Sequence, residues 1–117
     1  MSDSSDKREF DRKQLVYYLT VLYHESDRIA GYLADISENG MMLFSPESMA
    51  PESTGTFRIG PDPELGLSAP LVLDARCMWC EKDVNPDYYI IGFRFLDLDQ
   101  SRQEAVGRLV KKYGFDH

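Results

Sequence analysis

The sequence contains no apolar run close to the roughly 20 residues that a helix needs to span a bilayer. Its first 14 residues are almost wholly polar or charged, so the apolar stretch of a secretory signal is missing as well. Neither a Walker loop nor a Gly-x-Ser-x-Gly motif occurs in the chain. These absences predict a cytoplasmic protein that does not insert into a membrane and is not an enzyme.

Cysteine is scarce, and the only two cysteines, Cys77 and Cys80, form Cys-Met-Trp-Cys. A structural zinc site needs four ligands, and no second Cys or His pair accompanies them. The redox motif with this spacing takes its reactive thiolate from a helix N-terminus, whereas these cysteines lie in an alternating strand pattern. Because residues three apart on a strand point to opposite faces, we expect Cys77 in the core and Cys80 outside, with no metal or cofactor.

Positive charge is also in short supply. The net charge is −7, and a nucleic-acid polymer needs a broad basic face to neutralise its phosphates, so we exclude that class of partner. The exception is a basic cluster near the N-terminus, formed by Lys7, Arg8, Arg12 and Lys13. This cluster fits either a solvated tail, balanced by neighbouring carboxylates, or a site for a small anion.

The rest of the composition suits one folded domain. The chain has 117 residues, of which 43% are hydrophobic and 28% are charged, as is typical of a single globular core. Short segments rich in β-branched and aromatic residues alternate with turn-forming clusters. They predict six strands, at residues 15–23, 28–36, 40–44, 54–59, 71–80 and 89–96. Six short strands at this spacing favour a small antiparallel barrel.

The last two strands show the clearest alternation of side chains. One face of the fifth strand carries the residues expected in the core, namely Leu71, Leu73, Ala75, Cys77 and Trp79. The sixth strand presents Tyr89, Ile91, Phe93 and Phe95 in the same way.

A helix is predicted at the C-terminal end of the chain. Ser101 and Glu104 match a capping box at its start. One apolar stripe, which we expect to pack on the barrel, consists of Val106, Leu109, Val110 and Tyr113. Lys111 and Lys112 suit the negative end of the helix dipole, and Gly114 suits a helix stop.

Two short motifs are candidates for ligand binding. Arg8 and Arg12 stand four residues apart just before the first strand, and Asp35-Ile36-Ser37-Glu38-Asn39-Gly40 forms an Asp-x-Ser-x-x-Gly segment between the second and third strands. Each motif alone is common. The second also fits a plain turn, in which Asp35 or Ser37 bonds nearby backbone amides.

Together and in this order, the two motifs resemble the PilZ domain family. The resemblance runs from about Lys7 to Phe95 and includes the Gly-Met-Met-Leu after the turn, Ala-Arg-Cys-Met-Trp in the fifth strand and Gly-Phe-Arg-Phe in the sixth. It implies a mainly β fold, a six-stranded antiparallel barrel with a C-terminal helix. It also implies a receptor for cyclic di-GMP (c-di-GMP) that signals to an effector protein.

The resemblance implies a ligand site made by Arg8, Arg12, Asp35, Ser37 and Gly40. Guanidinium groups can hold the phosphates and guanines bidentately, and an ionised Asp35 can accept hydrogen bonds from guanine donors. Lys7 stands where many members carry another arginine, so it is a weaker candidate and the number of bound ligands stays open.

We divide the chain into an N-terminal arm, residues 1–14, and a barrel domain with its helix, residues 15–117. Ordering of the arm over the ligand is the expected signal to an unidentified effector protein. The alternative is a PilZ-like interaction domain that binds no nucleotide. Such members generally lack one or both motifs, whereas both are present in this sequence.

Overall fold

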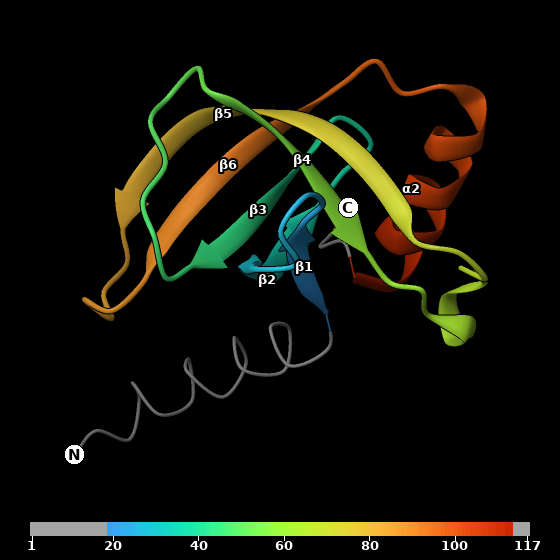
Figure 1. Cartoon of the computed structure of the whole chain (residues 1–117), viewed down its shortest axis with the longest axis horizontal. Coiled ribbons are helices and arrows are strands. Elements are labelled where there is room, and N and C mark those ends of the chain that lie inside the picture. Colours follow the sequence, from blue (N-terminus) through green and yellow to red (C-terminus); the bar gives the residue numbers. More distant parts are fainter. Residues whose placement is uncertain (1–18, 114–117) are drawn as a thin grey trace.

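The computed structural model of the chain describes residues 19–113, apart from the side chain of Leu65. Within this range, antiparallel strands close into a barrel in the order β1-β2-β3-β6-β5-β4 (Figure 1). The strands are β1 (Thr20–Tyr23), β2 (Ile29–Ile36), β3 (Gly40–Ser45), β4 (Thr54–Ile59), β5 (Leu71–Lys82) and β6 (Tyr89–Leu96). The predicted six-stranded antiparallel barrel is thus confirmed. Residues 15–18 of the predicted first strand lie outside the described range.

The strand bounds follow the apolar segments and turn clusters of the sequence closely. β4 has the predicted bounds, and β2 and β3 each differ from prediction by one residue. β5 continues to Lys82, two residues beyond the predicted end. A short 3-10 helix, η1 (Pro63–Leu65), was not predicted; its first turn is capped by Asp62, whose Oδ1 accepts from Glu64 N at 3.0 Å.

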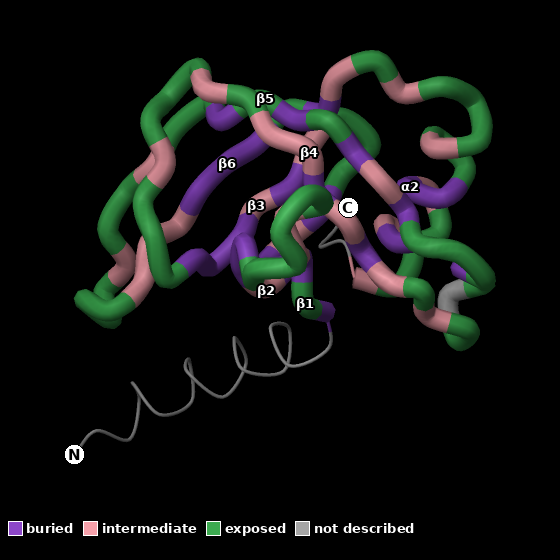
Figure 2. The backbone as a smooth tube through the Cα atoms, in the orientation of Figure 1, coloured by how far each residue is buried: buried purple, intermediate pink, exposed green. Residues whose placement is uncertain are grey.

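Every strand contains buried residues (Figure 2), and their side chains form one core in the barrel. Phe57 is fully buried and meets Phe93 edge-on with ring centroids 5.0 Å apart. Leu43 and Leu73 are also fully buried. The inward faces predicted for β6, and for β5 as far as Cys77, are confirmed.

α2 (Gln100–Tyr113) packs at one end of the barrel, opposite the tip of the β5–β6 hairpin (Figure 1). Val106 and Leu109 of the predicted stripe are buried, and Val110 and Tyr113 pack against the core. Lys111 and Lys112 occupy the last turn as predicted, and Gly114 lies outside the described range.

The N-cap of α2 differs from the prediction. Asp99 Oδ1 accepts from Arg102 N at 2.9 Å, so Asp99 caps the helix and Ser101 lies inside it. The capping-box prediction was therefore wrong. A carboxylate at this position satisfies a free N–H group and also opposes the positive end of the helix dipole. Among the described residues, no helix is long and apolar enough to cross a membrane.

Candidate ligand-binding site

A β-bulge at Met78 places Trp79 on the outside of the barrel. Cys77 pairs with Phe93 and Trp79 pairs with Gly92, so one extra residue stands between two consecutive pairs. Met78 and Trp79 both face outward, with 47% and 38% of their surface exposed. A bulge inserts one residue into a strand and inverts the alternation beyond it. The prediction that Trp79 belongs to the core was therefore wrong.

The same bulge turns Cys80 toward the interior. Cys80 is half-buried and packs against the core, so its predicted outward position was also wrong. Cys77 is fully buried, as predicted. Burial, and to a lesser extent the neighbouring Cys80, raise the pKa of the Cys77 thiol, which makes it a poor nucleophile. The described residues contain no cluster of His, Cys, Asp or Glu that could hold a metal ion.

A second bulge, at Ala34 in β2, gives Asp35 its outward orientation. Leu33 pairs with Leu43 and Asp35 pairs with Met42, which leaves Ala34 as the extra residue. Regular alternation from the buried Leu33 would turn Asp35 inward, whereas the bulge leaves it half-exposed and buries Ile36 instead. Asp35 Oδ1 accepts from Ile36 N at 2.8 Å, which fixes the carboxylate close to the backbone.

The two bulges bring Asp35 and Trp79 into one row across the barrel surface. Asp35 pairs with Met42, Met42 with Gly92, and Gly92 with Trp79. Three strand spacings separate the ends of the row, which is roughly 14 Å along the sheet. A ligand that contacts both ends must therefore be larger than a single nucleobase.

A shallow hollow of about 300 Å³ follows this row. Its lining combines the Asp35–Gly40 turn, the apolar side chains of Met42, Met78 and Trp79, and the guanidinium-bearing residue Arg94. The lining of this one hollow thus includes a carboxylate, an aromatic side chain and a positive charge. These groups suit a ligand with hydrogen-bond donors, a flat ring system and an anionic group.

The Asp-x-Ser-x-x-Gly segment folds as a tight turn between β2 and β3. Ser37 N donates to Gly40 O at 2.8 Å, and Asn39 N donates to Ser37 Oγ at 3.3 Å. The Ser37 hydroxyl is exposed and donates only a long bond, 3.4 Å, to Gly40 O. The serine therefore stabilises the turn, and its oxygen also faces solvent beside the hollow.

Gly40 is required by the barrel itself. A Cβ atom at this position would lie 2.0 Å from Phe93 O, which belongs to the backbone of the neighbouring β6. The resemblance implied that Gly40 belongs to the ligand site; the described contacts show that its missing side chain allows close approach of β6. The glycine thereby lets the turn sit directly against the strand that carries Gly92 and Arg94.

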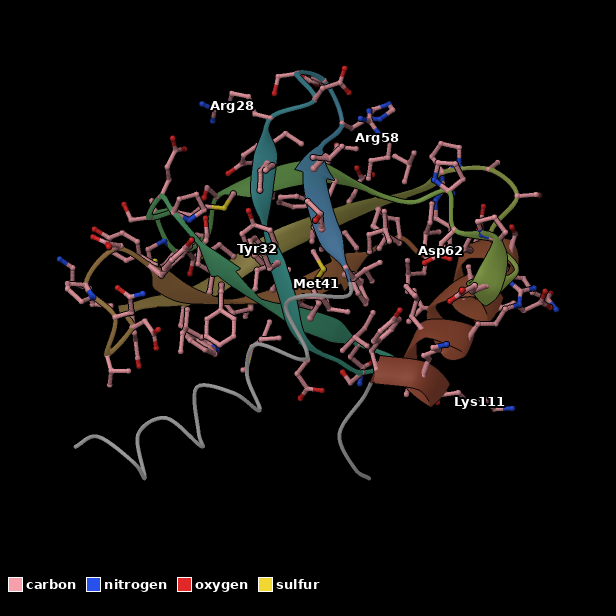
Figure 3. The ribbon with its side chains drawn as sticks, turned by 90° about the horizontal axis from the view of Figure 1, so that it is seen from below. Arg28, Tyr32, Met41, Arg58, Asp62 and Lys111 are labelled. Atoms are coloured by element: carbon pink, nitrogen blue, oxygen red, sulfur yellow. The ribbon has the colours of Figure 1, made fainter. Side chains whose placement is uncertain are left out.

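A larger hollow, about 620 Å³, lies beside the β1–β2 turn. Its charged lining consists of the carboxylates of Glu25, Asp74 and Asp97 and one cation, Arg28. Arg28 forms an ion pair with Glu47, and Arg58 pairs with Asp27 on the other side of the turn (Figure 3). An anionic ligand is therefore disfavoured at this hollow.

Three of the predicted ligand residues, Lys7, Arg8 and Arg12, lie outside the described range. Asp35, Ser37 and Gly40 lie together at one edge of the hollow, as the motif suggested. Sequence reasoning missed Trp79 and Arg94 as parts of this surface. No sequence signal marked Trp79 as an outward residue, because the outer face of the predicted strand already contained the apolar Val72.

Comparisons with known proteins bear on the family and on the fold. The sequence profile of the PilZ domain matches residues 6–112, and no curated protein matches the chain. The fold is similar to the PilZ domain of YcgR from Escherichia coli, solved with c-di-GMP, at a TM-score of 0.61 and 12% identity over 84% of this chain and 83% of that one. It is also similar to the Bacillus subtilis inhibitor of motility MotI/DgrA, at a TM-score of 0.58 and 14% identity over 80% of this chain and 46% of that one.

A third similar structure is a tetrameric PilZ-domain protein from Xanthomonas campestris that self-assembles through a helical bundle. Its TM-score is 0.54, with 22% identity over 93% of this chain and 59% of that one. At these identities the structural similarities show a shared fold, and the family assignment rests on the match to the sequence profile.

Proposed function

The chain belongs to the PilZ domain family, and we propose that it is a non-catalytic receptor that binds c-di-GMP and passes the signal to a protein partner. The family is one of c-di-GMP receptors. The observation that carries the proposal is the row from Asp35 to Trp79, because two bulges turn a carboxylate and an indole onto the same surface.

Asp35 is the proposed guanine-recognising group. Guanine presents an amino group and a ring N–H that a carboxylate can accept, whereas adenine lacks that arrangement of donors. The bond from Ile36 N occupies Oδ1 of Asp35 and holds the group in place. Ser37 supplies a hydroxyl contact beside it, and Gly40 sets the turn against β6.

Trp79 is the proposed stacking surface for a base. Its indole is partly exposed and lies against the Gly92 backbone. Stacking of a nucleobase on an aromatic side chain contributes about 1–3 kcal/mol. Because the hollow is lined by Met42 and Met78 as well, the base would exchange water for polarisable apolar surface on binding.

Arg8 and Arg12 are the proposed clamp, with Lys7 as an additional cation. Arginine holds phosphate oxygens or the guanine edge bidentately, whereas lysine acts as a point charge. We propose that residues 1–14 act as an arm that orders over the ligand, and that residues 15–117 form the barrel unit with its helix. Ordering of a segment changes the surface that a partner meets.

The competing function is an interaction domain that has lost nucleotide binding. The presence of both motifs in the sequence, together with the outward Asp35 and Trp79, favours binding. Titration calorimetry of the full chain with c-di-GMP tests the proposal directly. A saturable heat is expected, and at 100 times the dissociation constant the ligand should stabilise the fold by about 2.7 kcal/mol. A chain that gives neither heat nor a thermal shift would be the non-binding alternative.

A further inference from the structure

Arg76 and Arg94 face each other on the outside of the barrel. They form a directly opposed pair between β5 and β6, and both are exposed. On its other side Arg94 pairs with Gly40, so it borders the turn that begins at Ser37. Directly opposed side chains on one sheet face have Cβ atoms about 4.5–5.5 Å apart. The two arginine side chains therefore leave the barrel wall next to each other, and Arg94 lines the proposed ligand hollow.

The charges of this pair are not neutralised within the described part of the chain. The side chains of Arg76 and Arg94 form no hydrogen bond or ion pair with any residue from 19 to 113, whereas those of Arg28, Arg58 and Arg102 each hold a carboxylate. The nearby carboxylate of Asp74 accepts from Thr56 Oγ1 at 2.7 Å. Like charges directly opposite each other destabilise a sheet. The chain carries 20 acidic residues, but none of those in the described range pairs with either of these arginines.

We infer that Arg76 and Arg94 form a subsite for a phosphodiester group of the cyclic dinucleotide. The inference rests on the proposed function and adds a phosphate site on the barrel wall, separate from Arg8 and Arg12. Two neighbouring guanidinium groups can hold the oxygens of one phosphate through charge-assisted hydrogen bonds. The anion would also remove the repulsion between the two arginines.

The position of Arg94 favours a small ligand over an acidic protein surface. Arg94 lines the same hollow as Asp35 and Trp79, so an anion bound there is continuous with the proposed base contacts. The phosphodiester group bound by the arginine pair belongs either to the ligand held by Asp35 or to a second ligand molecule stacked beside it. Both present the same chemistry to the arginine pair, and the number of bound ligands separates them.

Titration calorimetry with c-di-GMP on the full chain tests the subsite. The variants are Arg94→Gln and the double variant Arg76→Gln/Arg94→Gln, with Arg108→Gln as the control. Arg108 is an exposed residue of α2 beside Gly66, so this control removes the same charge away from the hollow. The double variant should bind about ten- to a hundredfold more weakly, as expected for the loss of charge-assisted hydrogen bonds.

Two outcomes support the subsite and separate its sources. Weaker binding at unchanged stoichiometry assigns the phosphate to the ligand that Asp35 holds, and a fall in stoichiometry from two to one assigns it to a second ligand. The melting temperature of the free double variant should equal or exceed that of the wild type, because the repulsion is gone. If the wild type binds c-di-GMP and the double variant binds it with the same affinity and stoichiometry, the subsite is wrong and the proposed function stands. A wild-type chain that binds no c-di-GMP overturns the proposed function together with it.

Discussion

The indole of Trp79 occupies the space above Gly92 that a side chain would otherwise fill. A Cβ atom at Gly92 would lie 2.4 Å from both Nε1 and Cε2 of the indole. The absence of a side chain at Gly92 therefore lets the indole lie at this position on the outer face of the barrel. Through this contact, a residue with no side chain of its own positions the proposed stacking surface.

Gly92→Ala should displace the indole and weaken c-di-GMP binding by about fivefold or more, which corresponds to the lower end of the stacking contribution, about 1 kcal/mol. The fold should lose about 1–3 kcal/mol of stability, because the added methyl group overpacks the contact. Trp79 is the only tryptophan in the chain, so its fluorescence emission reports the displacement as a red shift.

Gly107→Ala is the matched control for this glycine. Gly107 lies within α2, and a Cβ atom there would meet nothing within 4 Å. The substitution should stabilise the helix by about 0.5–1 kcal/mol and leave ligand affinity unchanged. If Gly92→Ala retained wild-type emission and affinity, the positioning role of Gly92 would be wrong.

Trp79→Ala should cost more in binding than in folding. The exposed fraction of Trp79, 38%, makes it a surface residue, so the loss of unfolding free energy should be well below the about 3–5 kcal/mol of a buried aromatic side chain. Binding should weaken by about 1–3 kcal/mol through loss of stacking. Phe57→Ala, at a fully buried position, is the comparison and should show the large folding loss. Equal losses of stability in the two variants would mean that the Trp79 side chain belongs to the core.

Within the barrel, the sequence prediction and the structure differ most at the bulge in β5. Segments rich in β-branched and aromatic residues predicted all six strands, and period-two alternation predicted the inward face of β5 as far as Cys77. A bulge carries no marker of its own in the sequence, because the extra residue is set by pairing with the neighbouring strand. The prediction therefore failed at Trp79, immediately after the extra residue Met78.

The candidate site was likewise predictable from the sequence only in part. The turn from Asp35 to Gly40 was predictable because it is local in sequence and because its residue types favour turns. The row that links Asp35 to Trp79 depends on the register of four strands, which are far apart in sequence. The pairing of Arg76 with Arg94 depends on the same register, so sequence reasoning missed it as well.

Asp35→Asn should weaken c-di-GMP binding by about 1.5–3 kcal/mol, the contribution of a hydrogen bond to a charged group. It should also reduce the preference for c-di-GMP over cyclic di-AMP. Asparagine keeps an oxygen that can accept from Ile36 N, so the turn should stay intact. Calorimetry with both ligands measures the preference, and Glu38→Gln, an exposed change in the same turn, serves as control. Equal affinity of the wild type for the two ligands would contradict guanine recognition by Asp35.

Stability at alkaline pH should depend on Cys77. Burial raises the pKa of this thiol above its ordinary value of 9.0, so the folded state keeps the proton at a pH where the unfolded state loses it. The contribution of the protonated Cys77 thiol to the free energy of unfolding is fully present below pH 9.0 and is lost as pH rises through the folded-state pKa. Urea unfolding between pH 8 and pH 10 should therefore show a steeper decline for the wild type than for Cys77→Ala. Parallel declines in the two proteins would show that the buried thiol does not control this range.

The last prediction concerns the N-terminal arm. Residues 1–14 contain little apolar side-chain surface besides Phe10, and ordering of the backbone costs about 1–2 kcal/mol per residue. We expect the amides of residues 7–13 to exchange rapidly with deuterium in the free protein and slowly with saturating c-di-GMP, because the ligand supplies contacts for Arg8 and Arg12.

Two variants, Arg8→Ala and Arg12→Ala, separate the arm's role in binding from any role in folding. Each should weaken binding by about 1.5–3 kcal/mol, as expected for a lost charge-assisted hydrogen bond, with little change in the melting temperature. Exchange protection of residues 7–13 should fall in both variants at a fixed ligand concentration. Equal protection of these amides with and without ligand in the wild type would mean that the arm is already formed. Signalling would then need another element, such as α2, whose exposed Lys111 points away from the barrel (Figure 3). Rapid exchange in both states, together with unchanged affinity of the variants, would instead assign the basic cluster to a solvated tail.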